Sequence, residues 1–226
     1  MKLLALETSS SIGSIALLHG DELIERFIAT PREQTDLVLP FVEDVLGAAG
    51  LALRDLDAIA FGRGPGSFTG LRIAAAITQG LSFSSGVPAV GVSSLEALAQ
   101  RAWREVGVDD ALVCIDARMR EVYAARYVVR GRRATLLGAE RLCPPEALTV
   151  PGAVEGEGFS AVGDGFAAYR DALAPVIARA SRVVAKLVPS ARDLLVAAAE
   201  EVSAGRFLEP EAALPVYLRD ESAWRR

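Results

Sequence analysis

A buried strand that ends in a carboxylate indicates the fold. Residues 3–9 read Leu-Leu-Ala-Leu-Glu-Thr-Ser, so an apolar run ends at Glu7 and continues as a polar turn. The pattern recurs 109 residues later, where residues 113–116 (Val-Cys-Ile-Asp) align with residues 4–7 and end at Asp116. Helices that begin at Ser94 and Ser190 repeat likewise, 96 residues apart. Matches that keep their order indicate a duplicated α/β unit, and the shorter second spacing indicates that the second copy lost a helical element.

The segments around these repeats are typical of a mixed sheet with helices on its faces. Hydrophobic periodicity in the first half predicts three strands and then a helix, a strand, a helix, a strand and a helix, at residues 2–7, 12–18, 22–29, 35–46, 56–61, 67–82, 88–92 and 95–105. The expected fold class is α/β, with a duplicated mixed sheet and flanking helices. We expect one lobe over residues 1–108 and another over 109–226, with the tail after residue 206 returning to the first lobe.

Composition excludes several classes of protein. One histidine and two cysteines in 226 residues are too few for a closed zinc site or a disulfide framework, so we expect no metal site. No apolar run approaches the roughly 20 residues of a membrane helix, and the apolar start is too short for a secretory signal. We therefore expect a cytoplasmic protein without a membrane partner.

The net charge of −5 conceals a basic segment. Residues 118–141 contain seven arginines and two glutamates, a local charge of +5, so the rest of the chain carries −10. An acidic chain as a whole is a poor match for nucleic acid, but this segment has the charge to contact RNA phosphates or an acidic partner. A solvated edge strand protected by its charges explains the same pattern equally well.

A glycine-rich segment, residues 62–72, joins a predicted strand to a predicted helix. Free N–H groups at a helix start attract anions, and glycine lets a phosphate approach the backbone; the Lys-Ser/Thr pair of a Walker A loop is missing. The alternative is a tight turn with Ser67 as helix cap. Glu7 and Asp116 follow strands and have a structural alternative as well. The candidates for a nucleotide cleft are Glu7, Thr8, Ser9, Gly62, Gly64, Gly66, Ser67, Thr69 and Asp116.

Small residues mark one stripe of the helix predicted at 67–82. Ala74, Ala75, Ala76 and Gly80 would let another helix approach closely. Packing on its own sheet explains the stripe, and so does contact with another subunit, shared with the helix at 35–46.

Three stretches of the sequence resemble the bacterial TsaB family, also called YeaZ. They are residues 4–9 (LALETS), 64–72 (GPGSFTGLR) and 215–219 (PVYLR). The resemblance spans nearly the whole chain. It implies two ribonuclease H-like lobes of the actin/Hsp70/sugar-kinase-like (ASKHA) fold. It also implies a role in making threonylcarbamoyladenosine on the adenosine beside the tRNA anticodon.

The resemblance further implies a non-catalytic subunit, with no catalytic residue of its own. It would pair with the catalytic subunit TsaD, be joined by the ATPase TsaE, and contact tRNA indirectly. The corresponding helix start, residues 32–37, has no histidine to match the metal ligands of TsaD. The implied partner face, which would also form a homodimer, contains Leu37, Val38, Phe41, Val42, Phe68, Arg72, Ala75 and Ala76. No tightly bound cofactor is implied, and ATP or ADP would bind at the interlobe cleft or at a composite site.

Two other functions remain open at this point. The first is that of a weak ATPase acting through Glu7. The second is that of a glycoprotease-type peptidase, which is an older label for this superfamily. The peptidase lacks a metal pair, an oriented base and an activated nucleophile in the sequence. A homodimeric binding protein without a tRNA role is a further reading.

Overall fold

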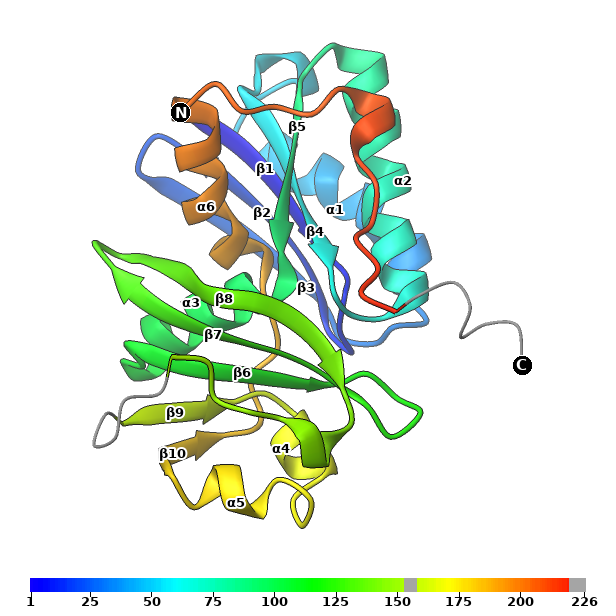
Figure 1. Cartoon of the computed structure of the whole chain (residues 1–226). Coiled ribbons are helices and arrows are strands. Elements are labelled where there is room, and N and C mark those ends of the chain that lie inside the picture. Colours follow the sequence, from blue (N-terminus) through cyan, green and yellow to red (C-terminus); the bar gives the residue numbers. More distant parts are fainter. Residues whose placement is uncertain (153–157, 220–226) are drawn as a thin grey trace. The chain divides into compact units, whose positions relative to one another are not determined.

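The computed structural model describes residues 1–152 and 158–219. Its contacts divide the chain into two compact units, shown in Figure 1. The first unit contains Met1–Ala97 and Pro189–Val216, and the second contains the described residues of Leu98–Val188 together with residues 217–219. Each unit is built on one five-stranded sheet.

The first sheet has the strand order β3-β2-β1-β4-β5. Its strands are β1 (Lys2–Glu7), β2 (Gly13–His19), β3 (Glu22–Ile28), β4 (Ala58–Gly64) and β5 (Ala89–Ser93). β1 pairs antiparallel with β2 and parallel with β4, so the central strand joins an antiparallel half to a parallel half. β4 continues three residues beyond the predicted strand, because Gly62 and Gly64 still pair with β5.

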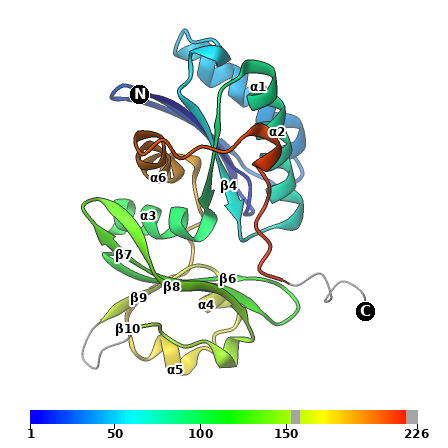
Figure 2. The same cartoon turned by 45° about the horizontal axis from the view of Figure 1, so that its top comes forward.

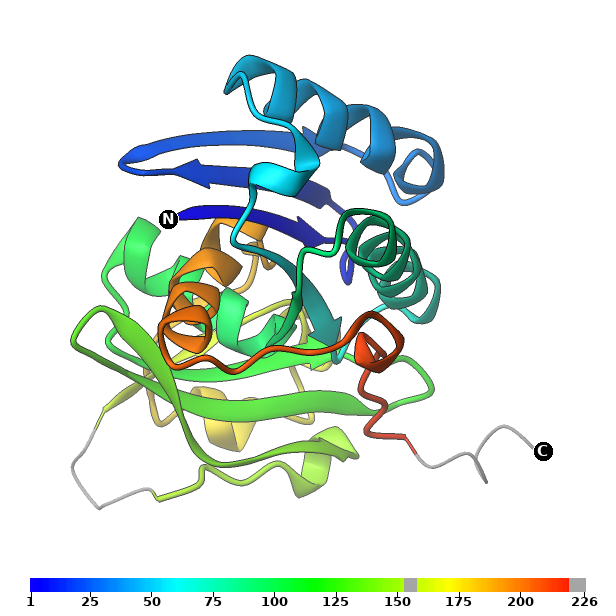
Figure 3. The ribbon, with the colours of Figure 1, turned by 90° about the horizontal axis from the view of Figure 1, so that it is seen from above.

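Helices cover both faces of the first sheet, as Figure 3 shows. Side chains alternate along β1: Leu4 and Leu6 pack with α1 (Gln34–Ala48), whereas Leu3 and Ala5 pack with α6 (Ala191–Ser203). α2 (Phe68–Ser85) lies on the α1 side, where it packs on β4. Because both faces are covered, four successive residues of β1 are fully buried, which explains the continuous apolar run in the sequence.

The second sheet repeats the topology of the first. Its order is β10-β9-β6-β7-β8, from β6 (Asp110–Asp116), β7 (Val122–Arg130), β8 (Arg133–Cys143), β9 (Phe159–Val162) and β10 (Ala180–Val184). Each strand pair has the direction of its counterpart in the first sheet. The predicted duplicated mixed sheet with flanking helices is therefore confirmed, and this arrangement is that of two ribonuclease H-like lobes of the ASKHA fold.

Apart from α3 (Ser94–Val106), the α-helices described in the second unit are only four residues long. α3 lies on one face of this sheet, and α4 (Gly165–Ala168) and α5 (Ala174–Ile177) lie on the other (Figure 2). Within the described residues, the connection from β8 to β9 contains only the 3-10 turn η2 (Pro145–Ala147), where the first unit has α1. The predicted loss of a helical element falls at this connection.

The division of the chain into these two units differs from the lobe boundary after residue 108 that the sequence predicted. α6 lies late in the sequence but belongs to the first unit, because its alanines and leucines cover the Leu3 side of β1. The segment after residue 206 also lies on the first unit: Leu208 forms a bridge with Ala89, and the 3-10 turn η3 (Pro210–Ala212) packs on α2. Residues 220–226, the end of the predicted tail, lie outside the described residues.

A third short 3-10 turn, η1 (Leu53–Asp55), precedes β4.

Among the described residues, no helix combines the length and the apolarity needed to cross a membrane.

Candidate functional site

The carboxylate of Glu7 is fully buried at the end of β1. Its Oε1 atom accepts the backbone N–H of Ser9 at 2.6 Å, and its Oε2 atom accepts the hydroxyl of Ser94 at 3.0 Å. Both oxygens therefore have donors from within the first unit. In this conformation Glu7 is positioned as a structural group beneath the glycine-rich segment.

Glycines of residues 62–70 lie against this turn at distances that exclude a side chain. A Cβ atom on Gly62 would lie 2.2 Å from Oε2 of Glu7, and one on Gly66 would lie 2.6 Å from the carbonyl oxygen of Ser9. A Cβ on Gly70 would lie 1.8 Å from the carbonyl oxygen of Thr8. The three glycines thus let the segment contact the chain's own turn closely. This contact explains their presence, and no ligand is needed to explain it.

The start of α2 joins the same cluster. Ser67 accepts the N–H of Gly70 on its hydroxyl at 3.4 Å, as an N-cap does, and its own N–H donates to the carbonyl of Ser9 at 2.7 Å. The Thr8 hydroxyl donates to the carbonyl of Gly70 at 2.6 Å. Thr69 is exposed, and Gly64 is buried with a φ of +104°. The structure therefore brings together eight of the nine cleft candidates, and nucleotide binding by them stays a prediction.

Burial sets the protonation behaviour of Glu7. Loss of water raises the pKa of this carboxyl above its ordinary value of 4.5, and hydrogen bonds from Ser9, Ser94 and Thr8 offset part of the rise. The folded state consequently binds the proton more tightly than the unfolded state. The stability that Glu7 contributes is fully present below pH 4.5 and is lost as the pH rises through the higher folded pKa.

Replacement of Glu7 by glutamine tests this linkage. The glutamine oxygen can accept the Ser9 N–H while its NH2 group donates to the Ser94 hydroxyl, so the packing is kept and the titration is removed. We expect the unfolding free energy of Glu7→Gln to fall less than that of the wild type between pH 5 and pH 8, measured by urea denaturation. Glu22→Gln, at an exposed position on β3, should leave the slope unchanged. Parallel profiles for wild type and Glu7→Gln would contradict the assignment.

Asp116, the ninth candidate, lies in the second unit at the end of β6, the counterpart of β1. Its carboxylate accepts the backbone N–H of Arg118 at 2.8 Å and the hydroxyl of Tyr169 at 2.9 Å, and it pairs with the Arg118 guanidinium at 3.0 Å. The backbone N–H of Asp116 donates to Asp164 at 3.0 Å. The residue therefore organises the loop that follows β6.

An apolar groove lies between α1 and α2 on the outside of the first unit. We call it the α1–α2 groove. It has a volume of about 480 Å³ and is lined by Thr35, Leu39, Phe68, Thr69, Arg72, Ile73, Ala76 and Ile77. Leu39 and Phe68 are 47% and 40% exposed, and Phe83, further along α2, is 83% exposed. Three large apolar side chains on two neighbouring helices form the kind of surface that another protein covers.

The predicted partner face agrees with this groove only in part. Phe68, Arg72 and Ala76 line it, and Leu37 and Phe41 are half-buried at the base of α1. Val38, Val42 and Ala75 are instead buried in the core of the unit, because they point toward the sheet. The sequence analysis did not single out Thr35, Leu39, Ile73, Ile77 and Phe83 as partner residues. Apart from Thr35 these are apolar residues on the outer side of their helices, and that pattern was the available signal.

One cation lines the α1–α2 groove. The Arg72 guanidinium lies 3.7 Å from the centre of the Phe68 ring, so it stacks on the aromatic face. This stacking stabilises an arginine near the start of α2, just beyond the first turn, in which the helix dipole disfavours positive charge.

Neither the thiols nor the other ligating groups form a reactive centre in the part of the chain described. Burial raises the pKa of the Cys114 thiol, and it also raises the pKa of Cys143. Within residues 1–152 and 158–219, no group of three or more histidine, cysteine, aspartate or glutamate side chains is arranged to hold a metal ion.

Comparison with known proteins gives the family. A protein-family model described as TsaD, tRNA N6-adenosine threonylcarbamoyltransferase, matches residues 29–226 of this chain. An Escherichia coli (strain K12) protein named tRNA threonylcarbamoyladenosine biosynthesis protein TsaB is 38% identical over 231 residues, which cover 100% of this chain and 98% of that protein. The chain belongs to the TsaB family. The resemblance on three sequence stretches is thereby confirmed.

Other TsaB-family proteins agree in sequence and in structure. The protein of that name from Haemophilus influenzae is 40% identical over 155 residues, 65% of each chain. The crystal structure of a Pseudomonas aeruginosa protein described as similar to peptidase YEAZ superposes with a TM-score of 0.91 at 43% identity, covering 96% of this chain and 99% of that one. YeaZ from Pseudomonas aeruginosa superposes with a TM-score of 0.87 at 41% identity, with the same coverage. Both superpositions extend over nearly the whole of this TsaB-family chain.

Proposed function

We propose that this chain is a non-catalytic subunit in the biosynthesis of threonylcarbamoyladenosine on tRNA. The observation that carries the proposal is the end-to-end match to a protein named for that pathway, at 38% identity. The chain acts by supporting a TsaD-like catalytic subunit that transfers the threonylcarbamoyl group to the adenosine beside the anticodon. We place this assembly in the cytoplasm.

The α1–α2 groove supports the role of a subunit. Leu39, Phe68 and Phe83 expose apolar surface that gains stability when a partner excludes water from it. The proposed occupant is the TsaD-like subunit, and a second copy of this chain occupies the same face when that subunit is absent. A TsaE-like ATPase joins the assembled pair.

The state of Glu7 supports a role without chemistry of its own. A catalytic carboxylate has to reach a substrate, whereas this one is fully buried and accepts two hydrogen bonds from its own unit. ATP or ADP is not expected to bind tightly to this chain alone, since the glycines of residues 62–70 contact the chain's own turn. A composite site formed with partner subunits is the proposed place for nucleotide.

Reconstituted tRNA modification tests the proposal. Product yield is measured with the TsaD-like subunit, the TsaE-like ATPase, tRNA and threonylcarbamoyl-adenylate, with and without this chain. We expect omission to lower the yield by about 5-fold to 150-fold, the range of a typical coupling between protein sites. Heat-denatured chain is the matched control and should not restore the yield. Equal yields with and without the native chain would refute the proposal.

Calorimetry with ATP on the isolated chain separates this role from the alternative of a weak ATPase. Micromolar binding that is lost in Glu7→Gln would favour the ATPase.

A further inference from the structure

Three consecutive residues between β6 and β7 have left-handed backbone conformations. Arg118, Met119 and Arg120 have φ angles of 60°, 55° and 61°. Residues with a Cβ atom rarely visit this region even singly, because the side chain crowds the following carbonyl oxygen. A strained segment of this kind persists only where its surroundings hold it, and such segments gather at functional sites. We call residues 117–121 the left-handed loop.

Contacts from both sides hold the left-handed loop. Asp116 accepts the N–H of Arg118 at 2.8 Å and pairs with its guanidinium. The N–H of Glu121 donates to the carbonyl of Arg118 at 3.0 Å, and the N–H of Ala117 donates to the carbonyl of Glu121 at 3.0 Å. These bonds fix the loop at its two ends.

Arg219 holds the loop from the C-terminal segment. Its guanidinium donates to the carbonyl of Ala117 at 3.0 Å, contacts the sulfur of Met119 at 3.0 Å and pairs with Glu121 at 2.7 Å. Arg219 is only 9% exposed, so it shapes the loop without adding an accessible cation to the surface. It is a positioning residue.

The loop presents positive charge to solvent. The Arg118 side chain is 86% exposed despite its pairing with Asp116, and Arg120 is exposed. Arg141 is also exposed. It lies on β8, which forms a strand pair with β7, the strand that follows the loop. The acidic neighbours Asp116 and Glu121 pair with Arg118 and Arg219, which leaves Arg120 and Arg141 as the exposed cations outside these two ion pairs. Arg126 differs, because it is buried in a pair with Asp110 at 2.6 Å.

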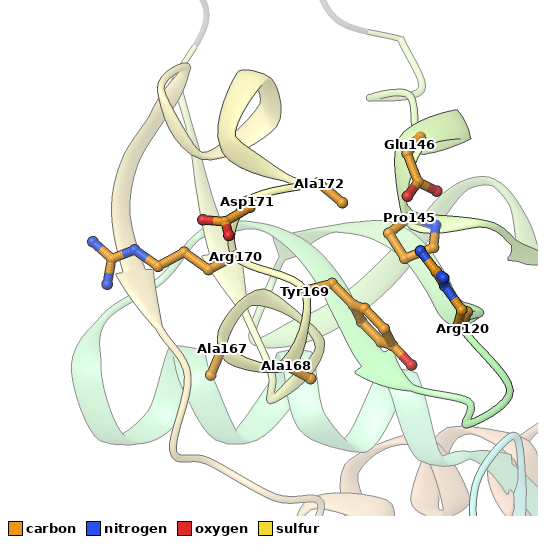
Figure 4. A pocket seen from close by; sticks show the side chains of 9 residues that line it. All are labelled: Arg120, Pro145, Glu146, Ala167, Ala168, Tyr169, Arg170, Asp171 and Ala172. Atoms are coloured by element: carbon orange, nitrogen blue, oxygen red, sulfur yellow. The ribbon is translucent and has the colours of Figure 1, made fainter.

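A pocket of about 340 Å³ adjoins the loop in the second unit. Figure 4 shows the Tyr169 side chain directed to the part of the pocket where Arg120 and Pro145 lie, whereas Arg170 points away from it. Glu146 and Asp171 also line the pocket, so it is polar and mixed in charge. Arg120 lines the pocket, and Arg118, which pairs with Asp116 at 3.0 Å, lies two residues before it in the loop.

We propose that the left-handed loop is a contact site for the phosphate backbone of RNA. The inference rests on the proposed function, which makes tRNA the RNA concerned. Guanidinium groups match phosphate geometry with paired N–H donors, and phosphate contacts position a nucleic acid without reading its sequence. The held backbone fixes the two arginines before binding, which lowers the entropy lost when tRNA is bound.

Filter binding of tRNA to the full-length chain, over a series of salt concentrations, tests the inference. We expect Arg118→Ala/Arg120→Ala to weaken binding about tenfold and to make the negative slope of log K against log salt shallower by about 2, because each arginine that neutralises a phosphate makes that slope steeper by about 1. Arg54→Ala/Arg179→Ala removes two exposed arginines elsewhere and is the matched control. Equal affinity and equal slope for the two double variants would overturn the inference.

Two further variants separate the shape of the loop from its charge. Arg219→Gln leaves both exposed arginines in place but releases the loop, so we expect it to weaken tRNA binding as well. Met119→Gly favours the left-handed backbone and should bind like the wild type. Melting curves establish that each variant is folded. Wild-type binding by a folded Arg219→Gln would show that the held loop is not required and would contradict the inference.

The test also distinguishes this inference from the proposed function. If the chain is needed for tRNA modification but the Arg118/Arg120 double variant binds tRNA normally, the contact site is wrong and the function stands. If the chain is dispensable for modification and its tRNA affinity still depends on these arginines, the function is wrong and the contact site stands. Unchanged tRNA binding together with weaker binding of a subunit would assign the loop to a protein partner instead.

Discussion

Substitution of Ala76 by glutamate is expected to abolish the proposed pairing with a TsaD-like subunit while leaving the chain folded. Ala76 is exposed and lines the α1–α2 groove, so the new carboxylate is solvated in the free chain and loses that water in the complex, and a pair with Arg72, one turn earlier on α2, returns only part of the loss. An incompletely compensated charge buried at an interface costs about 2–5 kcal/mol, which corresponds to a loss of affinity of roughly 30-fold to 4,000-fold.

The neighbouring positions provide the controls for this experiment. Ala178→Glu adds the same charge at an exposed position in the second unit and should leave both affinity and melting temperature unchanged. Ala75→Glu should lower the melting temperature, since Ala75 is 4% exposed and packs against Phe61 and Ala89 in the core. Affinity is measured by titration calorimetry. Retained wild-type affinity in a folded Ala76→Glu chain would exclude the groove as the partner site.

The second large effect is expected at Gly70. A Cβ there would lie 1.8 Å from the carbonyl oxygen of Thr8, which is backbone and cannot move aside without displacing the turn after β1. Movement would also break the 2.6 Å hydrogen bond from Thr8 and the Ser67 cap. We expect Gly70→Ala to cost about 3 kcal/mol or more of stability, and to lower the melting temperature by roughly 6 °C or more.

At Gly80 on the same helix, we expect substitution by alanine to change the stability in the opposite direction. Nothing lies within 4 Å of a Cβ built at this position, and glycine weakens a helix interior. Gly80→Ala should therefore raise stability by about 0.5–1 kcal/mol. Chemical denaturation of the two variants side by side checks both signs. An equal shift for both would mean that helix propensity, rather than the contact with Thr8, governs Gly70.

The fold was largely predictable because its information is local. An apolar run ending in a carboxylate defined β1 and β6, and serine-started helices defined α3 and α6. The division into units was harder to predict, because the sequence pattern of a helix does not indicate which sheet the helix will cover. α6 packs on β1, far from its neighbours in the sequence, and no local signal encodes that choice.

The candidate site was predicted less completely, for two physical reasons. Close approach calls for glycine whether the approaching group is a phosphate or the chain itself, so Gly62 and Gly66 could not be assigned from sequence. α2 is rich in alanine and isoleucine around much of its circumference, so the sequence showed a small-residue stripe without showing its orientation. Ala75 therefore turned out to face the sheet and Ala76 the solvent.

The late position of α6 has a consequence for how the chain is made. During synthesis β1 appears first, yet its Leu3 and Ala5 side lacks a cover until Ala191–Ser203 has been produced. The backbone of Ala191 then bonds the Ser14 hydroxyl at 2.7 Å, across 177 residues of chain. The second sheet, which is continuous between Leu98 and Val188, can be completed earlier. β1 thus leaves the ribosome long before the helix that covers it, and its exposed strand face requires protection from aggregation in the meantime.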